Sequence, residues 1–258
     1  MSERVKIILD KNADILRLPA IALRGLVVFP GNIIHFEVGR KKSIAAIEWA
    51  MSNNNAVFLT AQQDMDVEDP GFKDLYAYGV VAEVKQVLRV SDELVKVLVE
   101  GKYRAKLLTL DSSGRFLLAS TKAAALRGTK SVDSARMEAL VRSVKEAFEE
   151  YLSLNPRLSK DVVYTIITNE DAALLCDYIP ANLLLKYTDK QALLNEGTVS
   201  GRLEKLLEIL RRETKILHIE KDIQSKVNEQ MDKNQRDYYL REQMRAISNE
   251  LDDFDDTR

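Results

Sequence analysis

In the first half of the chain, hydrophobic and polar positions alternate with a period of two, which predicts short β-strands. Apolar or alternating runs occupy Ala20–Leu23, Ile33–Val38, Ala56–Ala61, Tyr78–Val90, Leu94–Val99, Tyr103–Leu110 and Phe116–Thr121. In the longest run, every second residue is expected on one face of the strand: Val80, Ala82, Val84, Gln86 and Leu88. A polar turn follows this run, so it pairs with the next one as an antiparallel hairpin that Gly101 is expected to close. The run Lys41–Met51 has helical spacing instead.

After Gly128 the apolar spacing changes to the helical period of 3.6. Four helices are expected before residue 198: Ala135–Leu154, Lys160–Thr168, Glu170–Tyr178 and a short segment after Thr188. Ser159, Asn169 and the pair Thr188–Gln191 are the expected N-terminal caps, and Pro180 is expected to end the third helix. These helices carry enough apolar surface to form a compact bundle.

The segment from Ser200 to about Leu251 contains no Pro and no Gly beyond Gly201, so we expect one long helix. At 1.5 Å per residue it would be roughly 75–80 Å long. Its first turns carry a leucine stripe that should pack on the bundle: Leu203, Leu206, Leu207 and Leu210. Farther along, the stripe thins and then resumes: Ile223, Val227, Met231, Leu240, Met244, Ile247 and Leu251.

Acid–base pairs four residues apart support this helix, because each adds a small stabilisation in water. They are Glu208–Arg212, Asp222–Lys226, Glu229–Lys233, Asp232–Arg236 and Asp237–Arg241. A narrow apolar seam on a charged helix predicts a projecting arm that pairs with another helix. The alternative is a solvated helix that folds back as a hairpin.

Together these patterns predict an α+β chain in three parts. Residues 1–122 are expected to form a mixed β-barrel or sheet with one helix. Residues 123–198 should form an all-α bundle, and residues 199–258 the long projecting helix with an acidic tail.

Composition narrows the chemistry of this 258-residue chain. Its 38 Lys and Arg against 40 Asp and Glu give a net charge of −2, a balance that disfavours nucleic-acid binding. A single Cys suits a reducing compartment. No apolar run approaches the ~20 residues of a membrane span, and the N-terminus lacks a signal-peptide core. We therefore expect a cytoplasmic protein without membrane contact.

No motif predicts a catalytic, cofactor or metal site. Gly101-Lys102 lacks the spacing of a phosphate-binding loop, and Asp64–Asp69 lacks the Gly that a calcium loop needs. His35 and His218 lie far apart, and neither has a neighbouring Cys or second His at metal-ligand spacing. Cys176 lies among apolar residues and is interpreted as a small buried side chain. We therefore expect no catalytic activity, cofactor or metal in this chain.

Several blocks of sequence, ordered along the whole chain, carry a family resemblance. They are Leu18–Gly25, Val27–Gly31, Phe36–Ile44, Phe58–Asp64, Asp74–Gly79, Val95–Gly101 and Gln235–Ile247. Together they resemble the N-terminal region of bacterial-type ATP-dependent Lon proteases. Two residues depart from the family pattern. The family usually has Pro at the position of Ala22, and Pro is also common at the position of His35.

The resemblance implies a PUA-like β-domain followed by a helical bundle, with roles in substrate recognition and in assembly of a homohexamer. It also implies that this chain is a fragment of an ATP-dependent serine endopeptidase that degrades misfolded, abnormal and selected regulatory proteins. The ATPase domain, which would bind ATP and Mg, and the Ser–Lys peptidase domain are expected outside this chain.

The candidate contact residues are apolar and aromatic side chains that could bind many client sequences. They are Phe29, Tyr76 and Tyr78 in the β-half, and Met231, Tyr238, Tyr239, Leu240 and Met244 on the long helix. Phe29 and Tyr78 could instead belong to the core, and the helix residues to a helix–helix seam. The expected partners are unfolded or degron-bearing proteins and further copies of the chain.

Two other functions stay open at this point. The first is a purely structural module that oligomerises through the long helix. The second is a PUA-like nucleic-acid-binding module, which the charge balance disfavours.

Overall fold

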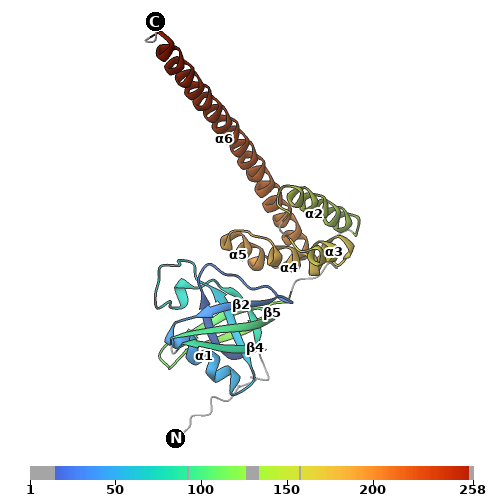
Figure 1. Ribbon diagram of the computed structural model, residues 1–258. Coiled ribbons are helices and arrows are strands. Elements are labelled where there is room, and N and C mark those ends of the chain that lie inside the picture. Colours follow the sequence, from blue (N-terminus) through green and yellow to red (C-terminus); the bar gives the residue numbers. More distant parts are fainter. Residues whose placement is uncertain (1–14, 92, 126–133, 157, 256–258) are drawn as a thin grey trace.

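The computed structural model describes residues 15–91, 93–125, 134–156 and 158–255, with side chains up to residue 247. Figure 1 shows a β-domain at one end, a group of short helices beside it, and one helix that projects far beyond both. This arrangement confirms the predicted α+β fold class.

Six strands build the β-domain: β1 (Ile15–Leu23), β2 (Ile33–Val38), β3 (Ala56–Ala61), β4 (Tyr78–Ser91), β5 (Leu94–Asp111) and β6 (Leu117–Ala123). Their order is β2-β5-β4-β3-β1-β6, and an additional pairing of β5 with β6 closes a barrel. The pair β1–β3 is parallel and the other pairs are antiparallel. Within the described residues β2 pairs with β5 alone, so β2 is an edge strand.

Alternate side chains of the barrel strands face two apolar clusters. Ile21 and Leu59 belong to the larger cluster, which continues into the helices, whereas Ala20 and Phe58 belong to the smaller one. The helix α1 (Lys41–Met51) has the bounds that its spacing predicts and packs against β1 and β3. The strands β1 and β3 are therefore buried on both faces and form nearly continuous apolar runs, whereas β2 alternates between exposed and partly buried side chains.

The predicted face of β4 is wrong beyond Val84. The pairing of β4 with β5 shifts register between Val84 and Gln86, which is a β-bulge. An extra residue in one strand reverses the alternation of side chains that follow it. Leu88 is consequently 58% exposed, and Val87 packs against the core in its place.

Gly101 does not close the hairpin but lies inside β5, which runs unbroken through it. A Cβ atom at Gly101 would stand 2.3 Å from the carbonyl oxygen of Phe29, so only glycine fits this crossing. The N–H of Gly101 donates to the carbonyl of Asn32 at 2.9 Å. The first half of β5 can thus pair with β2 and the second half with β6.

The short helices are α2 (Ser134–Leu154), α3 (Lys160–Thr168), α4 (Ala172–Asn182) and α5 (Tyr187–Asn195). Ser159 caps α3 as predicted, because its hydroxyl accepts a hydrogen bond from the N–H of Val162 at 3.4 Å. The other predicted caps are wrong. Asp171 caps α4, accepting from the N–H of Ala173 at 2.9 Å, while Asn169 binds the N–H of Asp171.

The remaining helix boundaries also differ from the prediction. No side chain caps α5, so Thr188 and Gln191 do not form the expected capping box. Pro180 lies within α4, which ends only at Asn182. Pro180 has no N–H to donate to the preceding turn, but the helix continues past it, and the N–H of Leu183 donates to the carbonyl of Ile179 at 3.1 Å.

The longest element is α6 (Val199–Asp255), a single helix of 57 residues. Its inner part, residues 199–217, packs against α2 and α4 and buries the predicted leucine stripe, with Leu207 half-buried. In its outer part, residues 218–247, every side chain is exposed. The outer part projects as an arm (Figure 1), so the hairpin alternative is wrong across these residues. Residues 256–258, the end of the expected acidic tail, lie outside the described residues.

The five predicted charge pairs on α6 do not form among the described side chains. Arg212 binds Asp189 of α5 at 2.6 Å instead, so this charge links two helices. Polar amides make contacts four residues apart in the outer part, such as Gln224 with Asn228 at 2.9 Å. The outer part also contains an ion pair three residues apart, Arg245 with Glu242 at 3.4 Å. The described side-chain contacts along the arm are thus mostly hydrogen bonds between neutral groups.

Candidate functional site

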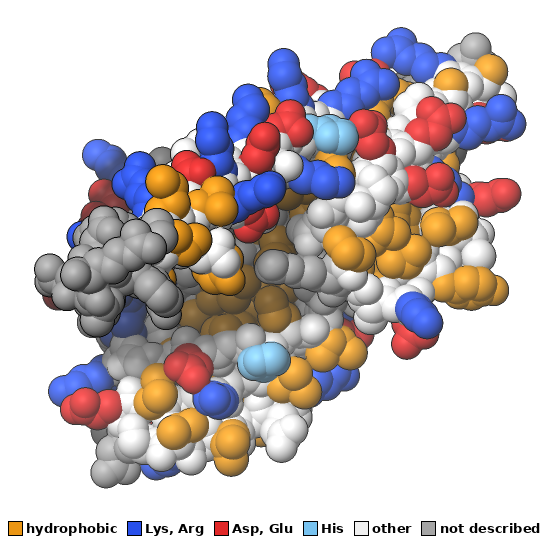
Figure 2. All heavy atoms as spheres, turned by 45° about the horizontal axis from the view of Figure 1, so that its top comes forward, with side chains coloured by type: hydrophobic (Ala, Val, Ile, Leu, Met, Phe, Trp, Pro, Cys, Tyr) orange, Lys and Arg blue, Asp and Glu red, His pale blue; other side chains and the backbone are white. Residues whose placement is uncertain are grey.

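The outer part of α6 is the first candidate surface, because it exposes large apolar side chains along its length. Met231, Tyr238, Tyr239, Leu240 and Met244 are between 48% and 72% exposed. In Figure 2, orange apolar side chains stand among blue and red charged ones over the visible face of the helices. Apolar exposure on this scale is typical of a surface that contacts another protein.

The candidates in the β-domain lie in different surroundings. Phe29 is fully buried, so it belongs to the core and its side chain is not available to a client. Tyr76 and Tyr78 are half-buried. Burial, together with the neighbouring Tyr187, raises the pKa of Tyr76. These candidates lie in the β-domain, and the arm projects away from it (Figure 1), so the two groups of candidates do not form one site.

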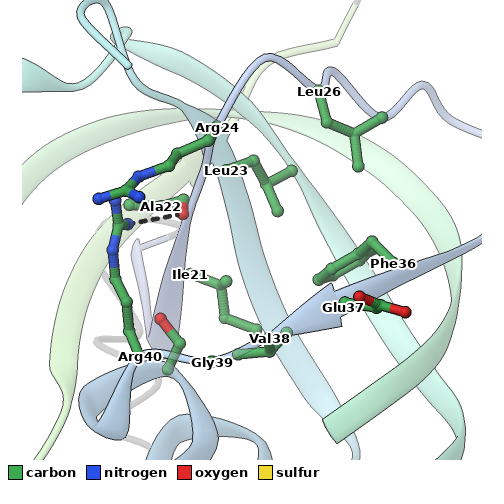
Figure 3. Close-up of a pocket in the computed structure, with 11 residues that line it drawn as sticks. Ile21, Ala22, Leu23, Arg24, Leu26, Phe36, Glu37, Val38, Gly39 and Arg40 are labelled. Atoms are coloured by element: carbon green, nitrogen blue, oxygen red, sulfur yellow. Dashed lines mark hydrogen bonds between the residues drawn. The ribbon is translucent and has the colours of Figure 1, made fainter. Parts of the chain in front are cut away.

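An apolar hollow of about 320 Å³ lies in the β-domain (Figure 3). Ile21 and Leu23 of β1 point toward Phe36 and Val38 of β2, and Leu26 of the connecting loop covers one side. A hollow lined in this way suits a large apolar side chain.

Two guanidinium groups lie beside β1 in the same region. Arg40 donates to the carbonyl of Ala22 at 3.2 Å, and Figure 3 shows Arg24 next to it. Burial and the charge of Arg24 lower the pKa of Arg40. Arg24 and Arg40 both donate hydrogen bonds to the carbonyl oxygen of Val67, which is neutral. Asp69 affects the pKa of Arg40 from a distance but forms its ion pair with Lys42, at 2.9 Å.

The open edge of β2 contributes to this hollow. In an antiparallel pair, alternate N–H and C=O groups point away from the partner strand. Edge strands are usually protected by lysine, proline or a bulge, whereas β2 has the sequence IIHFEV. An extended segment of another chain could pair with this edge.

A polar junction joins the β-domain to the helices. Arg104 of β5 and Arg202 of α6 both donate to the backbone carbonyl of Glu196, the latter at 3.0 Å. Arg202 is 1% exposed and also pairs with Asp177 of α4. Burial raises the pKa of Asp177, so desolvation offsets part of the attraction within this ion pair.

Two hydrogen bonds from α5 complete the junction. The side-chain amide of Gln191 donates to the carbonyl of Tyr78 at 2.8 Å, and the hydroxyl of Tyr187 donates to the carbonyl of Gln63 at 3.1 Å. Because α5 also packs on α6, these contacts orient the arm relative to the β-domain.

The described residues offer neither a metal site nor a membrane-spanning helix. Within this part of the chain, no group of three or more His, Cys, Asp or Glu side chains is arranged so that it could hold a metal ion. Nor does any helix in it combine the length and the hydrophobicity that crossing a bilayer requires. Burial raises the pKa of the Cys176 thiol to about 12, so this thiol is a poor nucleophile.

The hollow and the junction were not predicted from sequence. Periodicity shows that Ile33–Val38 is a strand but not that it lies at an edge. Arg104 and Glu196 are 92 positions apart, and no local pattern connects them.

Comparison with known proteins supplies a family. Residues 17–212 match the "ATP-dependent protease La (LON) substrate-binding domain". The Lon protease of Escherichia coli (strain K12) is 39% identical over 246 residues, which are 95% of this chain and 31% of that protein. The Lon protease of Heliobacterium modesticaldum (strain ATCC 51547 / Ice1) is 38% identical over 256 residues, covering 99% of this chain and 31% of that protein. The chain thus spans about a third of the length of these relatives.

Solved structures agree on the fold. The N-terminal domain of Mycobacterium avium complex Lon protease matches with a TM-score of 0.61 at 20% identity, covering 76% of this chain and 98% of that one. The Lon N-terminal domain protein from Xanthomonas campestris matches with a TM-score of 0.52 at 15% identity, covering 74% and 97%.

Proposed function

Because this chain belongs to the family of ATP-dependent protease La (LON) substrate-binding domains, we propose that it captures protein clients for a cytoplasmic ATP-dependent protease. The clients would be unfolded or degron-bearing proteins, including misfolded, abnormal and selected regulatory ones. An ATPase domain with ATP and Mg and a Ser–Lys peptidase domain, both outside this chain, would unfold and cleave them. The chain itself would bind clients without catalysis.

The observation that carries this proposal is the exposed apolar face of the outer part of α6. Met231 and Met244 are 63% and 72% exposed, and two adjacent tyrosines lie between them. Methionine adapts its shape to different partners, and tyrosine offers both an apolar ring and a hydroxyl. Such a surface binds many sequences, as the capture of unfolded proteins requires.

The hollow beside β2 supports the same function. An unfolded client is extended, so its backbone can pair with the open edge of β2 while one apolar side chain enters the hollow. Two separated contact surfaces also raise the overall affinity, since binding at one increases the local concentration at the other.

We also propose that the arm takes part in self-association, within a homohexamer of the full-length protein. Leu240, Met244 and Ile247 repeat with the spacing of a helix–helix seam and are exposed in the single chain. Client capture and self-association make different predictions for the same residues, and one experiment separates them.

The experiment measures the affinity of the chain for a permanently unfolded protein. Reduced, carboxymethylated α-lactalbumin with a fluorescent label serves as the client, and its native form as the comparison. Leu240→Asp with Met244→Asp should weaken binding about tenfold or more, because burying one such side chain is worth about 1.5–3 kcal/mol. The control Gln235→Asp adds the same type of charge at another exposed position and should leave the affinity unchanged.

Light scattering on the same samples gives the oligomeric state. If the double variant loses self-association but binds the unfolded client as tightly as the unaltered chain, the arm is an assembly device. Capture through the arm would then be wrong.

A further inference from the structure

A buried arginine without a carboxylate partner lies at the junction of the β-domain and the helices. Arg104 is 7% exposed. It donates to the carbonyl of Glu196, and the ring of Tyr78 lies 4.5 Å from its guanidinium carbon. Among the described residues no carboxylate lies within ion-pair distance, and Asp177, which acts on Arg104 from farther away, pairs with Arg202.

The junction is therefore short of one negative charge. Arg104 and Arg202 share one carbonyl oxygen, so two positive charges lie close together, and among the described residues Asp177 is the one acid that pairs with either of them. Arginine is almost never fully buried unless it is paired, because an unpaired charge is costly away from water. The ring of Tyr78 compensates only in part, since a cation–π contact is worth about 0.5–2 kcal/mol.

The junction also has a free donor and adjoining space. Nε of Arg104 is buried and has no hydrogen-bond partner. A cleft of about 280 Å³ is lined by Arg104, Arg202 and Asp177, and also by Lys102. Lys102 already pairs with Glu100 at 2.7 Å, so it does not supply the missing interaction.

We propose that this junction cleft binds an oxyanion, a phosphate or a carboxylate group, through the guanidinium of Arg104. The planar fork of arginine matches the oxygens of both groups, with two parallel hydrogen bonds. The anion would balance the charge of Arg104 and strengthen the attachment of the β-domain to α4 and α6. A ligand that binds the folded junction and not the unfolded chain stabilises the fold by an amount that grows with the logarithm of its concentration over its dissociation constant.

The test is thermal unfolding and titration calorimetry of the full 258-residue chain. Sodium phosphate and sodium acetate are compared with sodium chloride at the same ionic strength and pH. With one or both oxyanions we expect a saturable binding heat in calorimetry and a rise in Tm beyond that with chloride, which continues with the logarithm of the oxyanion concentration. A response to phosphate alone supports a site for phosphate groups, and a response to acetate supports a site for carboxylates.

Variants assign the response to Arg104. Arg104→Met keeps the length of the side chain and should weaken the affinity about tenfold or more, the size of a lost hydrogen bond between charged groups. The matched control Arg115→Met removes an exposed arginine that pairs with Glu48 and should bind as the unaltered chain does.

Arg104→Lys keeps the charge without the fork, so it should bind several-fold more weakly, and it serves if the Met variant does not fold. No saturable response to either oxyanion would overturn the proposal. Equal affinity in the Lys variant or in a folded Met variant would overturn it as well.

Discussion

The inner and outer parts of α6 belong to one helix and both carry apolar residues at helical spacing, yet their surroundings are opposite. In the inner part, Leu203, Leu206 and Leu210 are fully buried. In the outer part, Leu240 and Met244 repeat with similar spacing and are 48% and 72% exposed. The difference lies in what covers the stripe. α2 and α4 lie against the inner part, whereas the side chains of residues 218–247 are all exposed and α2 reaches only the start of the outer part, where His218 lies 3.8 Å from Glu150.

This comparison shows what an amphipathic pattern specifies. Periodicity determines which face of a helix gains free energy when it is covered, at about 25 cal/mol per Å² of apolar surface. It does not determine whether the covering element is in the same chain. The inner stripe therefore contributes to folding, whereas the outer stripe can contribute only to binding.

The largest effect is expected for the buried charge of the inner part. Arg202→Ala leaves Asp177 buried without its partner, so the free energy of unfolding should fall by about 3–5 kcal/mol. Urea denaturation followed by circular dichroism measures this loss. Arg211→Ala, an exposed arginine of the same part, should change stability by less than about 0.5 kcal/mol. Equal losses in the two variants would show that burial of Arg202 has no special role.

A matched pair of leucines tests the apolar stripes directly. Leu206→Ala should cost about 2–5 kcal/mol, because Leu206 is fully buried in the core and its truncation opens a cavity there. Leu240→Ala should cost less than about 0.5 kcal/mol in the single chain. Both are measured by the same denaturation, at a concentration where light scattering shows monomer. A large loss for Leu240→Ala in the monomer would mean that the outer part is covered after all.

The smallest expected effect comes from removing one methyl group on each side of the comparison. Ile209 is 3% exposed and Ile223 is 57% exposed. Ile209→Val should lower the free energy of unfolding by about 0.5–1.5 kcal/mol. Ile223→Val should not change the free energy of unfolding measurably. A larger loss of stability for Ile223→Val than for Ile209→Val would contradict the assignment of inner and outer parts.

Much of the secondary structure could be predicted because its signals are local. The bounds of Lys41–Met51 and Lys160–Thr168 agree with their spacing, and Ser159 caps as expected. The start of a helix depends on a side chain that accepts a hydrogen bond from a backbone N–H of the first turn, so it is decided within a few residues. The exposed arm was predictable for the same reason, since its seam is narrow and its other faces are charged.

The predictions failed where distant residues decide. Leu88 reverses its face because a bulge against β5 shifts the register, and Gly101 stays inside a strand because the chain at Phe29 crosses it. The alternation of apolar residues does not reveal where a bulge inserts an extra residue into a strand. A glycine is equally compatible with a turn and with a strand that another segment crosses closely.

The chain's own residues thus establish which segments are helix or strand, and which faces need cover, because those properties depend on neighbours within one or two turns. The open edge of β2 and the junction of Arg104 with Arg202 arise only when the barrel closes and docks on the helices. Their interactions join residues far apart in the sequence, and burial, which sets their strength, exists only in the folded chain.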